Sequence, residues 1–478
     1  MKFTKRMTVN AAFISIALLV SLLTGCSSKS GSLLNNIPED ATTVAVVDLD
    51  AILKNAGCRI DNGVITLSPD LEQLTSRMNP KQADMLEAVT KAAPAVNLDE
   101  VGVFSIDNYA GIALSLKAPE LFEQGVKAGA KETVSAAGQD VYVYDDIAIA
   151  IDGNYAWLTV NAVQMENVLN SLAKGNFGSK YPVLSENLAD KGNALRIVSQ
   201  VAENFAADPY NGVAQKFDRL FMVGKLKITD SVLDFEASFT DRDNKPLNFS
   251  PYFAETGTDF LRFVDPGSNV VIAIGKPESQ EMIQQVIAIF GRQFRDINSL
   301  LPMLKAVNGT TSASYRLTSD INLNDSPDWL NAGEYILTTQ IEGSESQSLM
   351  QMVQLAGGTK LEETPAGAEV VQYELKAMGT PYYIGLFQGT VAAGNRPISD
   401  TFSNSFTTDF QGARAGYVLT FAPGSPLSKA LDIPYGAYSS LIVKEQTINC
   451  KLRFNGSSRN VVATLINLLA TKNLVKIQ

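Results

Sequence analysis

Hydrophobic positions along the chain follow two different periods. Runs of β-branched and apolar residues typical of strands occur at 43–49 and 226–239, and an Asp-Ser turn within the second predicts a hairpin. Apolar residues at helical spacing predict helices over 119–128 and 161–173. Because tight turns join many of the strands and helices interrupt them, we expect an α+β fold in which helices pack on mainly antiparallel sheets.

Segments of the first half recur in the same order in the second half. The run that starts at Pro38 resembles the run that starts at Asp265, and "AGQDVYVY" resembles "AGAEVVQY". "KITDSVLDFEASF" resembles "IVKEQTINCKLRF", and the helical segment before "AGQDVYVY" also has a counterpart. Four matches in one order predict an internal duplication. We therefore expect two tandem similar lobes, at 37–263 and 264–478.

The N-terminal segment has the pattern of a secretory signal peptide. Three basic residues and no acid precede an apolar run at 11–23, which is shorter than the ~20 residues that span a bilayer. The run ends in "LTGC", which resembles the lipobox of bacterial lipoproteins. The resemblance implies that residues 1–25 are cleaved off and that the thiol of Cys26 is acylated. An ordinary signal peptide with an incidental Cys26 is the alternative.

The residues after Cys26 predict a tether and a location. Residues 26–36 begin with small polar side chains that need no packing partner, so we expect a flexible link to the first lobe. Neither an Asp directly after Cys26 nor an acidic run follows in the sequence. By resemblance to other lipoproteins, this predicts an anchor in the outer membrane and a protein that faces the periplasm. The membrane is then an expected partner, through the lipid on Cys26.

The composition excludes several kinds of function. The chain has 50 acidic and 39 basic residues and a net charge of −11, and loss of the basic N-terminal segment makes it more acidic. Nucleic acid is not an expected partner, because binding it requires basic patches. The sequence contains no histidine, which removes imidazole bases, Ser-His-Asp triads and His-based zinc sites. The sequence also lacks the common nucleotide-binding motifs, and we expect no cofactor.

Three short motifs match catalytic or metal-binding signatures only in part. Ser171 and Lys174 have the S-x-x-K spacing of Ser–Lys enzymes without the S-D-N and K-T-G motifs that accompany it. "DINLND" at 320–325 begins like a calcium loop but lacks its Gly and its final Glu. Asp241 and Asp243 stand in "TDRDNKP", which is typical of a hairpin turn. We therefore predict neither a catalytic set nor a metal site.

Four aromatic residues are the candidates for ligand binding. Trp157, Trp329, Tyr382 and Tyr383 have rings of the kind that stack on sugars. Trp157 also alternates with Tyr155 as residues do on the core face of a strand. Packing in a core or an interface is therefore the interpretation that the pattern favours for most of these residues, and stacking on a glycan is the alternative.

Cys58 and Cys450 are the thiols that remain after Cys26. Cys450 lies in an alternating strand pattern, which favours a buried thiol that behaves as a small apolar side chain. An oxidising compartment would permit a Cys58–Cys450 disulfide, which stays open as the alternative because spacing alone does not establish pairing.

The chain resembles the Bacteroidota lipoproteins grouped as DUF4836. The likeness rests on the lipobox, on the "IP-x-D-A-x-x-V" pattern that starts at Ile37, and on a second half without histidine motifs. It implies an envelope lipoprotein and brings no catalytic residues. We therefore predict a non-enzymatic lipoprotein that binds or scaffolds an envelope partner. Capture of a glycan or small ligand is the first alternative, and a hydrolase built on paired carboxylates is the second.

Overall fold

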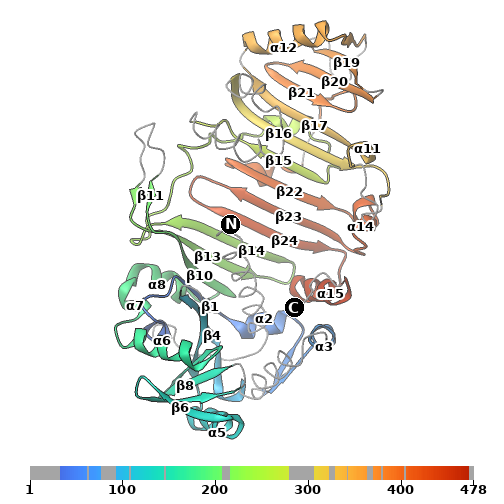
Figure 1. The fold of residues 1–478 in the computed structure, drawn as a ribbon. Helices are drawn as coiled ribbons and strands as arrows, with labels where there is room; N and C mark the ends of the chain where they lie inside the picture. Colours follow the sequence, from blue (N-terminus) through green and yellow to red (C-terminus); the bar gives the residue numbers. More distant parts are fainter. Residues whose placement is uncertain are drawn as a thin grey trace. The chain divides into compact units, whose positions relative to one another are not determined.

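The computed structural model describes residues 33–61, 64–76, 93–106, 109–144, 147–206, 216–278, 306–321, 329–341, 343–362, 370–377, 380–402 and 405–472. These residues form two compact units (Figure 1). The first unit runs as far as Phe205 and includes Phe217–Pro246 and the chain from Ser458 on, whereas the second is mainly Leu247–Ser457. The predicted signal peptide at 1–25 and the predicted lipidation site Cys26 lie outside the described residues.

An antiparallel sheet forms the centre of the first unit. Its strands lie in the order β14-β13-β10-β1-β4-β5-β9-β8-β7-β6. The central strand β1 is the run "TVAVV", which is apolar at successive positions, as strands are when both faces of a sheet are covered. The strands are β1 (Thr43–Val47), β4 (Val96–Ile106), β5 (Tyr109–Leu116), β6 (Glu132–Ala136), β7 (Gln139–Val143), β8 (Ala148–Asp152), β9 (Tyr155–Thr159), β10 (Leu195–Ala202), β13 (Leu220–Ile228) and β14 (Val232–Thr240).

Polar side chains cap the starts of two helices in the first unit. The side chains of Asp48 and Asn161 accept hydrogen bonds from backbone amides three residues later and start α2 and α6. The helices predicted at 119–128 and 161–173 are confirmed to within one residue at each end. The helical elements are η1 (Leu33–Asn36), α2 (Leu49–Asn55), α3 (Pro69–Thr75), η2 (Ala93–Ala95), α5 (Pro119–Gly129), α6 (Ala162–Leu172), α7 (Phe177–Lys180), α8 (Pro182–Ala189) and α15 (Val461–Lys472), and the short strands outside the main sheet are β2 (Arg59–Asp61), β3 (Val64–Thr66), β11 (Phe205–Ala206) and β12 (Lys216–Phe217).

The second unit is built around an antiparallel sheet of its own. Its strands lie in the order β24-β23-β22-β15-β16-β17-β21-β20-β19-β18. The strands are β15 (Val270–Ile274), β16 (Val307–Leu317), β17 (Gly333–Ile341), β18 (Thr359–Lys360), β19 (Val371–Ala377), β20 (Thr380–Phe387), β21 (Thr390–Gly394), β22 (Ala415–Phe421), β23 (Gly436–Val443) and β24 (Ile448–Asn455), and the helical elements are η3 (Asp259–Phe263), α11 (Trp329–Ala332), α12 (Gly343–Leu355), α13 (Thr407–Phe410) and α14 (Pro426–Ala430). Within the ranges that the structure describes, no helix has both the length and the apolar character needed to cross a membrane.

The two sheets have the same strand order. When the sheet strands of each unit are numbered along the chain, both sheets read 10-9-8-1-2-3-7-6-5-4 from one edge to the other. A short 3-10 helix, η1 or η3, precedes the first strand in each unit, and an α-helix, α5 or α12, follows the third strand. The chain is therefore α+β, as predicted, with one strand order used twice.

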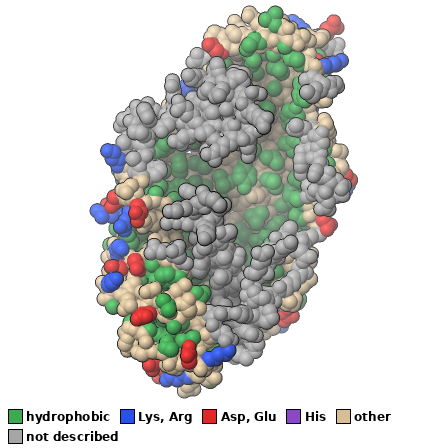
Figure 2. All heavy atoms as spheres, in the orientation of Figure 1, with side chains coloured by type: hydrophobic (Ala, Val, Ile, Leu, Met, Phe, Trp, Pro, Cys, Tyr) green, Lys and Arg blue, Asp and Glu red, His purple; other side chains and the backbone are tan. Residues whose placement is uncertain are grey.

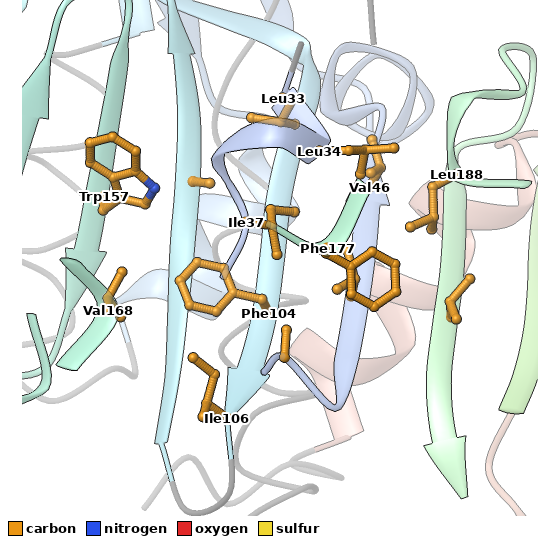
Figure 3. Close-up of a cluster of buried hydrophobic side chains, with 14 of the residues drawn as sticks. Leu33, Leu34, Ile37, Val46, Phe104, Ile106, Trp157, Val168, Phe177 and Leu188 are labelled. Carbon is orange, nitrogen blue, oxygen red and sulfur yellow. The ribbon is translucent and has the colours of Figure 1, made fainter. Parts of the chain in front are cut away.

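The main core of the first unit lies on one face of its sheet. Figure 3 shows Leu33 and Ile37, from the chain before β1, beside Phe104 of β4, Trp157 of β9 and Phe177 of α7. Each of these side chains is at most 3% exposed. Burial of one large apolar side chain stabilises a fold by ~1.5–3 kcal/mol. The prediction of a flexible tether over 26–36 is therefore wrong for Leu33–Asn36, because the leucines of η1 are part of this core.

The corresponding face of the second sheet carries two apolar clusters. Phe260 and Leu261 of η3 pack with Val271 of β15, Val418 of β22 and Phe410 of α13. A neighbouring cluster joins the last residue of η3 to β17, β20 and β21. In both units, the segment just before the first strand thus lies across the sheet and fills its core.

The predicted boundary at Val264 differs from the division into compact units. The second unit begins at Leu247, and the C-terminal helix α15 belongs to the first unit. There Arg459, just before α15, forms an ion pair with Asp70 of α3, and the Asn467 amide donates to the same carboxylate (2.9 Å). Sequence repeats show where equivalent strands begin, whereas a compact unit depends on which elements pack together, so the two boundaries need not coincide.

Candidate functional site

The four aromatic candidates do not form one binding platform. Trp157 is 3% exposed, and its indole nitrogen donates a hydrogen bond to the Asn36 carbonyl (2.7 Å). Stacking of a glycan on Trp157 is therefore wrong, because the ring is enclosed in the core of the first unit. Tyr382 and Tyr383 are adjacent on β20 and point to opposite faces of the sheet, and Tyr383 packs beside the cluster that contains Phe263. The side chain of Trp329 lies outside the described residues.

Trp157 offers a direct test of this structural role. Trp157→Phe should lower the free energy of unfolding by ~1–2 kcal/mol, because the Asn36 carbonyl loses its buried donor and the smaller ring leaves a void. Urea denaturation followed by circular dichroism would measure the loss. Tyr382→Phe, which changes a half-buried residue of the second unit, is the control and should cost less than 1 kcal/mol. An unchanged stability for Trp157→Phe would contradict the burial of the indole.

Cys58 and Cys450 occur as thiols, so the disulfide considered from the sequence is not formed in this structure. Cys58 belongs to the first unit and Cys450 to the second. Burial raises the pKa of the Cys58 thiol, and hydrogen bonding to Ser68 only partly opposes this shift. Cys58 is therefore an unreactive packing residue, whereas Cys450, which the strand pattern predicted to be buried, is only half-buried.

The partial catalytic and metal motifs have structural partners. Ser171 is buried, and its hydroxyl donates to a carboxylate oxygen of Asp40 rather than pairing with a lysine. Asp241 accepts hydrogen bonds from the amides of Asp243 (3.0 Å) and Lys245 (2.8 Å), which is the turn that its sequence predicts. Most of the segment 320–325 lies outside the described residues. Among the described residues, no group of three or more acidic or thiol side chains is placed to hold a metal ion.

A cluster of charged residues lies at the end of the first sheet. Arg196 and Glu100 are each 1% exposed, and Arg196 Nη1 donates to the Asp190 carbonyl (3.2 Å). Lys191 Nζ lies 3.6 Å from Glu100 Oε1. Burial lowers the pKa of Arg196, and the carboxylates of Glu100 and Asp48 oppose that shift. The charges neutralise one another within the fold, which indicates a structural ion network rather than a pair of catalytic carboxylates.

Asp265 forms a second ion network, in the second unit. Its Oδ2 lies 3.1 Å from Arg316 Nη1 and 3.2 Å from Arg396 Nη2, and its Oδ1 accepts the Gly267 amide (2.7 Å). Burial alone would raise the pKa of Asp265, but the amide and the two guanidinium groups together hold that pKa below its usual value. Asp265 thus connects the turn before β15 to Arg316 of β16 and to Arg396, which follows β21.

The lowered pKa of Asp265 predicts a pH-dependent contribution to stability. A depressed carboxyl pKa stabilises the fold above the ordinary Asp pKa of ~3.9, and the contribution disappears as the pH falls through the lower pKa of the folded state. Asp265→Asn should therefore lower the free energy of unfolding by ~1–2 kcal/mol at pH 7 and have little effect near pH 2. Denaturation curves at both pH values would measure this. A loss of equal size at both would contradict the ionic contribution.

The second face of the second sheet is apolar, although among the described residues no buried core cluster includes the middle of this face. The residues paired directly across five adjacent strands, β23, β22, β15, β16 and β17, are Leu441, Tyr417, Ile272, Ala313 and Leu337. Directly paired residues project from the same side of a sheet. We call this row and its two flanking rows the apolar face. The flanking rows are Val443, Ala415, Ile274, Thr311 and Thr339 on one side and Ser439, Leu419, Val270, Tyr315 and Tyr335 on the other.

The centre of the apolar face is open to solvent. Ile272 is 42% exposed, Leu337 is 50% exposed and Tyr417 is 38% exposed. Figure 2, which has the orientation of Figure 1, shows hydrophobic side chains at the surface in the region of these strands. None of the fifteen positions carries a charge, although charged residues make up 19% of the chain. The outer face of a solvent-exposed antiparallel sheet is ordinarily polar, so this surface is unusual.

Helices border the apolar face at two sides. Met350 and Val353 of α12 pack on Tyr373 of β19 and on partly buried residues of β20. Leu427 of α14 packs with Phe421, at the end of β22. These sheet residues project from the same side of the sheet as Ile272. Tyr373 is connected to Leu337 by direct cross-strand pairs, and Phe421 lies an even number of residues from Tyr417 on β22. Neither helix buries Tyr417, Ile272 or Leu337, which are each at least 38% exposed.

Sequence reasoning did not identify this surface, although the sequence contains a signal for it. The run "VVIAI" of β15 is apolar at successive positions, which predicts a strand with two apolar faces. One face takes up Val271 and Ala273, both fully buried, whereas the other presents Ile272. The equivalent strand β1, "TVAVV", is similarly apolar, but its Ala45 is only 9% exposed. Composition alone therefore does not show which apolar face stays open.

Comparison with known proteins assigns no family to the chain. No protein-family model matches the chain, and no curated protein is significantly similar to it. Crystal form IV of TP0453 aligns with a TM-score of 0.28 and 11% identity, covering 43% of this chain and 79% of that chain. Crystal form III of TP0453 aligns with a TM-score of 0.28 and 12% identity, covering 45% of this chain and 82% of that chain. A mutant of the GFP-like protein from Chiridius poppei has a TM-score of 0.10 and 12% identity over 55% of this chain and 100% of that one. These low TM-scores assign no function.

Proposed function

We propose that this protein is a lipid-anchored protein of the outer membrane that faces the periplasm and works by binding rather than by catalysis. In this proposal, Cys26 carries the acyl anchor, and the apolar face of the second unit is the binding surface. The resemblance to the DUF4836 lipoproteins supports the location. The absence of histidine from the sequence supports a non-catalytic function.

The observation that carries the proposal is the exposure of Ile272, Leu337 and Tyr417 in one row. Contiguous apolar surface is costly in water and marks interaction sites in soluble proteins. The row lies on paired strands, so its side chains are held in place before a ligand arrives. A rigid apolar surface of this kind suits binding, because ordering it costs little entropy.

The proposal also includes an internal duplication that gave two similar lobes. The shared strand order and the matching positions of η1 and η3 support it. Ala45 and Ile272 occupy equivalent positions in the first strand of each unit, but Ala45 is buried and Ile272 is exposed. On this interpretation, the two copies diverged, and the second copy acquired the binding surface.

The alternative functions have less support. Glycan capture loses its leading residue, because Trp157 is buried in the core. A carboxylate hydrolase needs two acids that face a substrate, whereas Glu100 is fully buried and has Lys191 as a neighbour. The binding proposal uses a surface that the structure exposes, and it is therefore the one we adopt.

Site-specific photocrosslinking in the native envelope tests the proposal. A benzophenone amino acid in place of Tyr417 lies on the apolar face, and the same group in place of Leu355, which is 89% exposed on α12, is the matched control. We expect an adduct from position 417 and little from position 355. Equal adduct yields at both positions, or none at position 417, would contradict the proposal.

A further inference from the structure

We infer that the apolar face of the second unit binds a lipid acyl chain. This inference rests on the proposed function, because it names the class of ligand for the same surface. Three properties of the face lead to it: the lack of charged and strongly polar groups, the length of the open row, and the helices that border it.

The apolar face offers a ligand almost nothing except hydrocarbon contact. Backbone amides and carbonyls of the five strands are used in pairing within the sheet, so only side chains meet a ligand. The polar groups among the fifteen positions are hydroxyls, such as those of Thr311 and Ser439. A sugar or a peptide backbone would lose hydrogen bonds to water on this surface without replacing them. A hydrocarbon chain has no hydrogen bonds to lose.

The open row has the length of a membrane acyl chain. From Leu441 to Leu337 it crosses five strands, which are spaced by ~4.8 Å, so the row extends over ~19 Å. The hydrocarbon core of a bilayer is ~30 Å thick, so an extended chain in one leaflet spans ~15 Å. One chain laid across the strands would contact Tyr417, Ile272 and Leu337, the three exposed members of the row.

The borders of the face favour a narrow ligand over a broad partner. α12 packs over β19 and β20, and α14 packs at the Phe421 end of β22. A helix with its side chains is ~10 Å across, so both rise well above the sheet. Tyr315 and Leu419 extend the apolar surface toward the α14 border, where they pack beside the cluster that contains Phe421. A linear chain needs only the width of the central row, whereas a broad partner would have to avoid both helices.

Binding of a fluorescent fatty acid tests the inference. Purified full-length chain should bind cis-parinaric acid, and the double variant Ile272→Thr/Leu337→Thr should bind it about tenfold more weakly. Threonine is a good strand residue, and both positions are at least 42% exposed, so the variant keeps the sheet. The matched control Leu355→Thr changes an exposed leucine outside the face and should bind within about twofold of the unchanged chain. Absence of binding, or equal loss in both variants, would overturn the inference.

The photocrosslink at position 417 separates failure of this inference from failure of the proposed function. Mass spectrometry of the crosslinked chain should show an added lipid, and this outcome supports the inference independently of the threonine variants. An adduct with another protein or with a second copy would overturn the acyl-chain inference and leave the binding function standing. A crosslink within the chain, which leaves its mass unchanged, would overturn both by showing that the chain covers its own face.

Discussion

Replacing Arg196 by Met should lower the free energy of unfolding by about 3–5 kcal/mol at neutral pH. Arg196 and Glu100 are each 1% exposed, and the guanidinium opposes the negative charges of Glu100 and Asp48. Met fills much of the same volume without the charge, so the carboxylates would stay in a region of low dielectric with less compensation. Urea denaturation followed by circular dichroism measures the loss.

The effect of Arg196→Met should depend on pH. Burial raises the pKa of Asp48, so its charged form destabilises the fold above the ordinary Asp pKa of ~3.9, and loss of Arg196 would raise that pKa further. Protonation removes this cost, so the difference between variant and unchanged chain should shrink as the pH falls toward 4. A difference that stays constant from pH 7 to pH 4 would show that lost packing, not charge, is responsible.

Lys225→Met is the matched control for Arg196→Met. Lys225 lies directly opposite Arg196 on the neighbouring strand β13. Its ammonium group forms an exposed ion pair with Asp190 (2.8 Å). Exposed pairs contribute only ~0–1 kcal/mol, so Lys225→Met should cost little. If the two variants lost the same stability, the buried network would have no special role in the first unit.

Replacing Cys26 by Ala should abolish the incorporation of labelled palmitate and release the protein from the membrane fraction. The expectation follows from the proposed anchor, because only a thiol forms the thioether to the lipid and the chain then lacks its membrane attachment. Growth of cells with labelled palmitate, followed by gel electrophoresis and fractionation, measures both effects. The loss should be complete rather than graded, because the anchor is a single covalent bond.

Cys450→Ala is the control for Cys26→Ala, because it removes a thiol of strand β24 and leaves the N-terminal segment intact. Palmitate labelling and membrane attachment of this variant should equal those of the unchanged chain. Labelling that survives in Cys26→Ala would show that the lipobox interpretation is wrong. The apolar face could still bind a ligand in that case, but the protein would act at a different location.

Local chemistry explains why several elements could be predicted from the sequence. Asn161 starts α6 through its side chain, and Pro119 opens α5 in the first turn, so both helices are specified by residues at their own ends. The hairpin of β13 and β14 turns where Asp230 and Ser231 interrupt two apolar runs. These features depend on neighbours within a few residues, which the sequence displays directly.

Trp157 and the two thiols show where local patterns were insufficient. An alternating strand pattern places Trp157 on one face but does not say whether that face is covered, and the segment 33–37 covers it from more than a hundred residues away. Cys58 and Cys450 belong to two different compact units, so the spacing of the two thiols in the sequence did not show whether they form a disulfide. The sequence supplied the residue types, but contacts of long range decided their roles.

The sequence by itself determined the α+β class, the ends of its best-defined helices and the lack of imidazole chemistry, because these depend on residue identity and on short-range periodicity. The tertiary structure alone decided that Arg196 and Glu100 share one buried end of a sheet, and that Ile272 stands exposed where Ala45 is covered. The physical reason is that a side chain becomes buried only when another element packs against it, which the residue itself does not specify. Strands with similar apolar patterns acquire different surfaces when the elements packed on them differ.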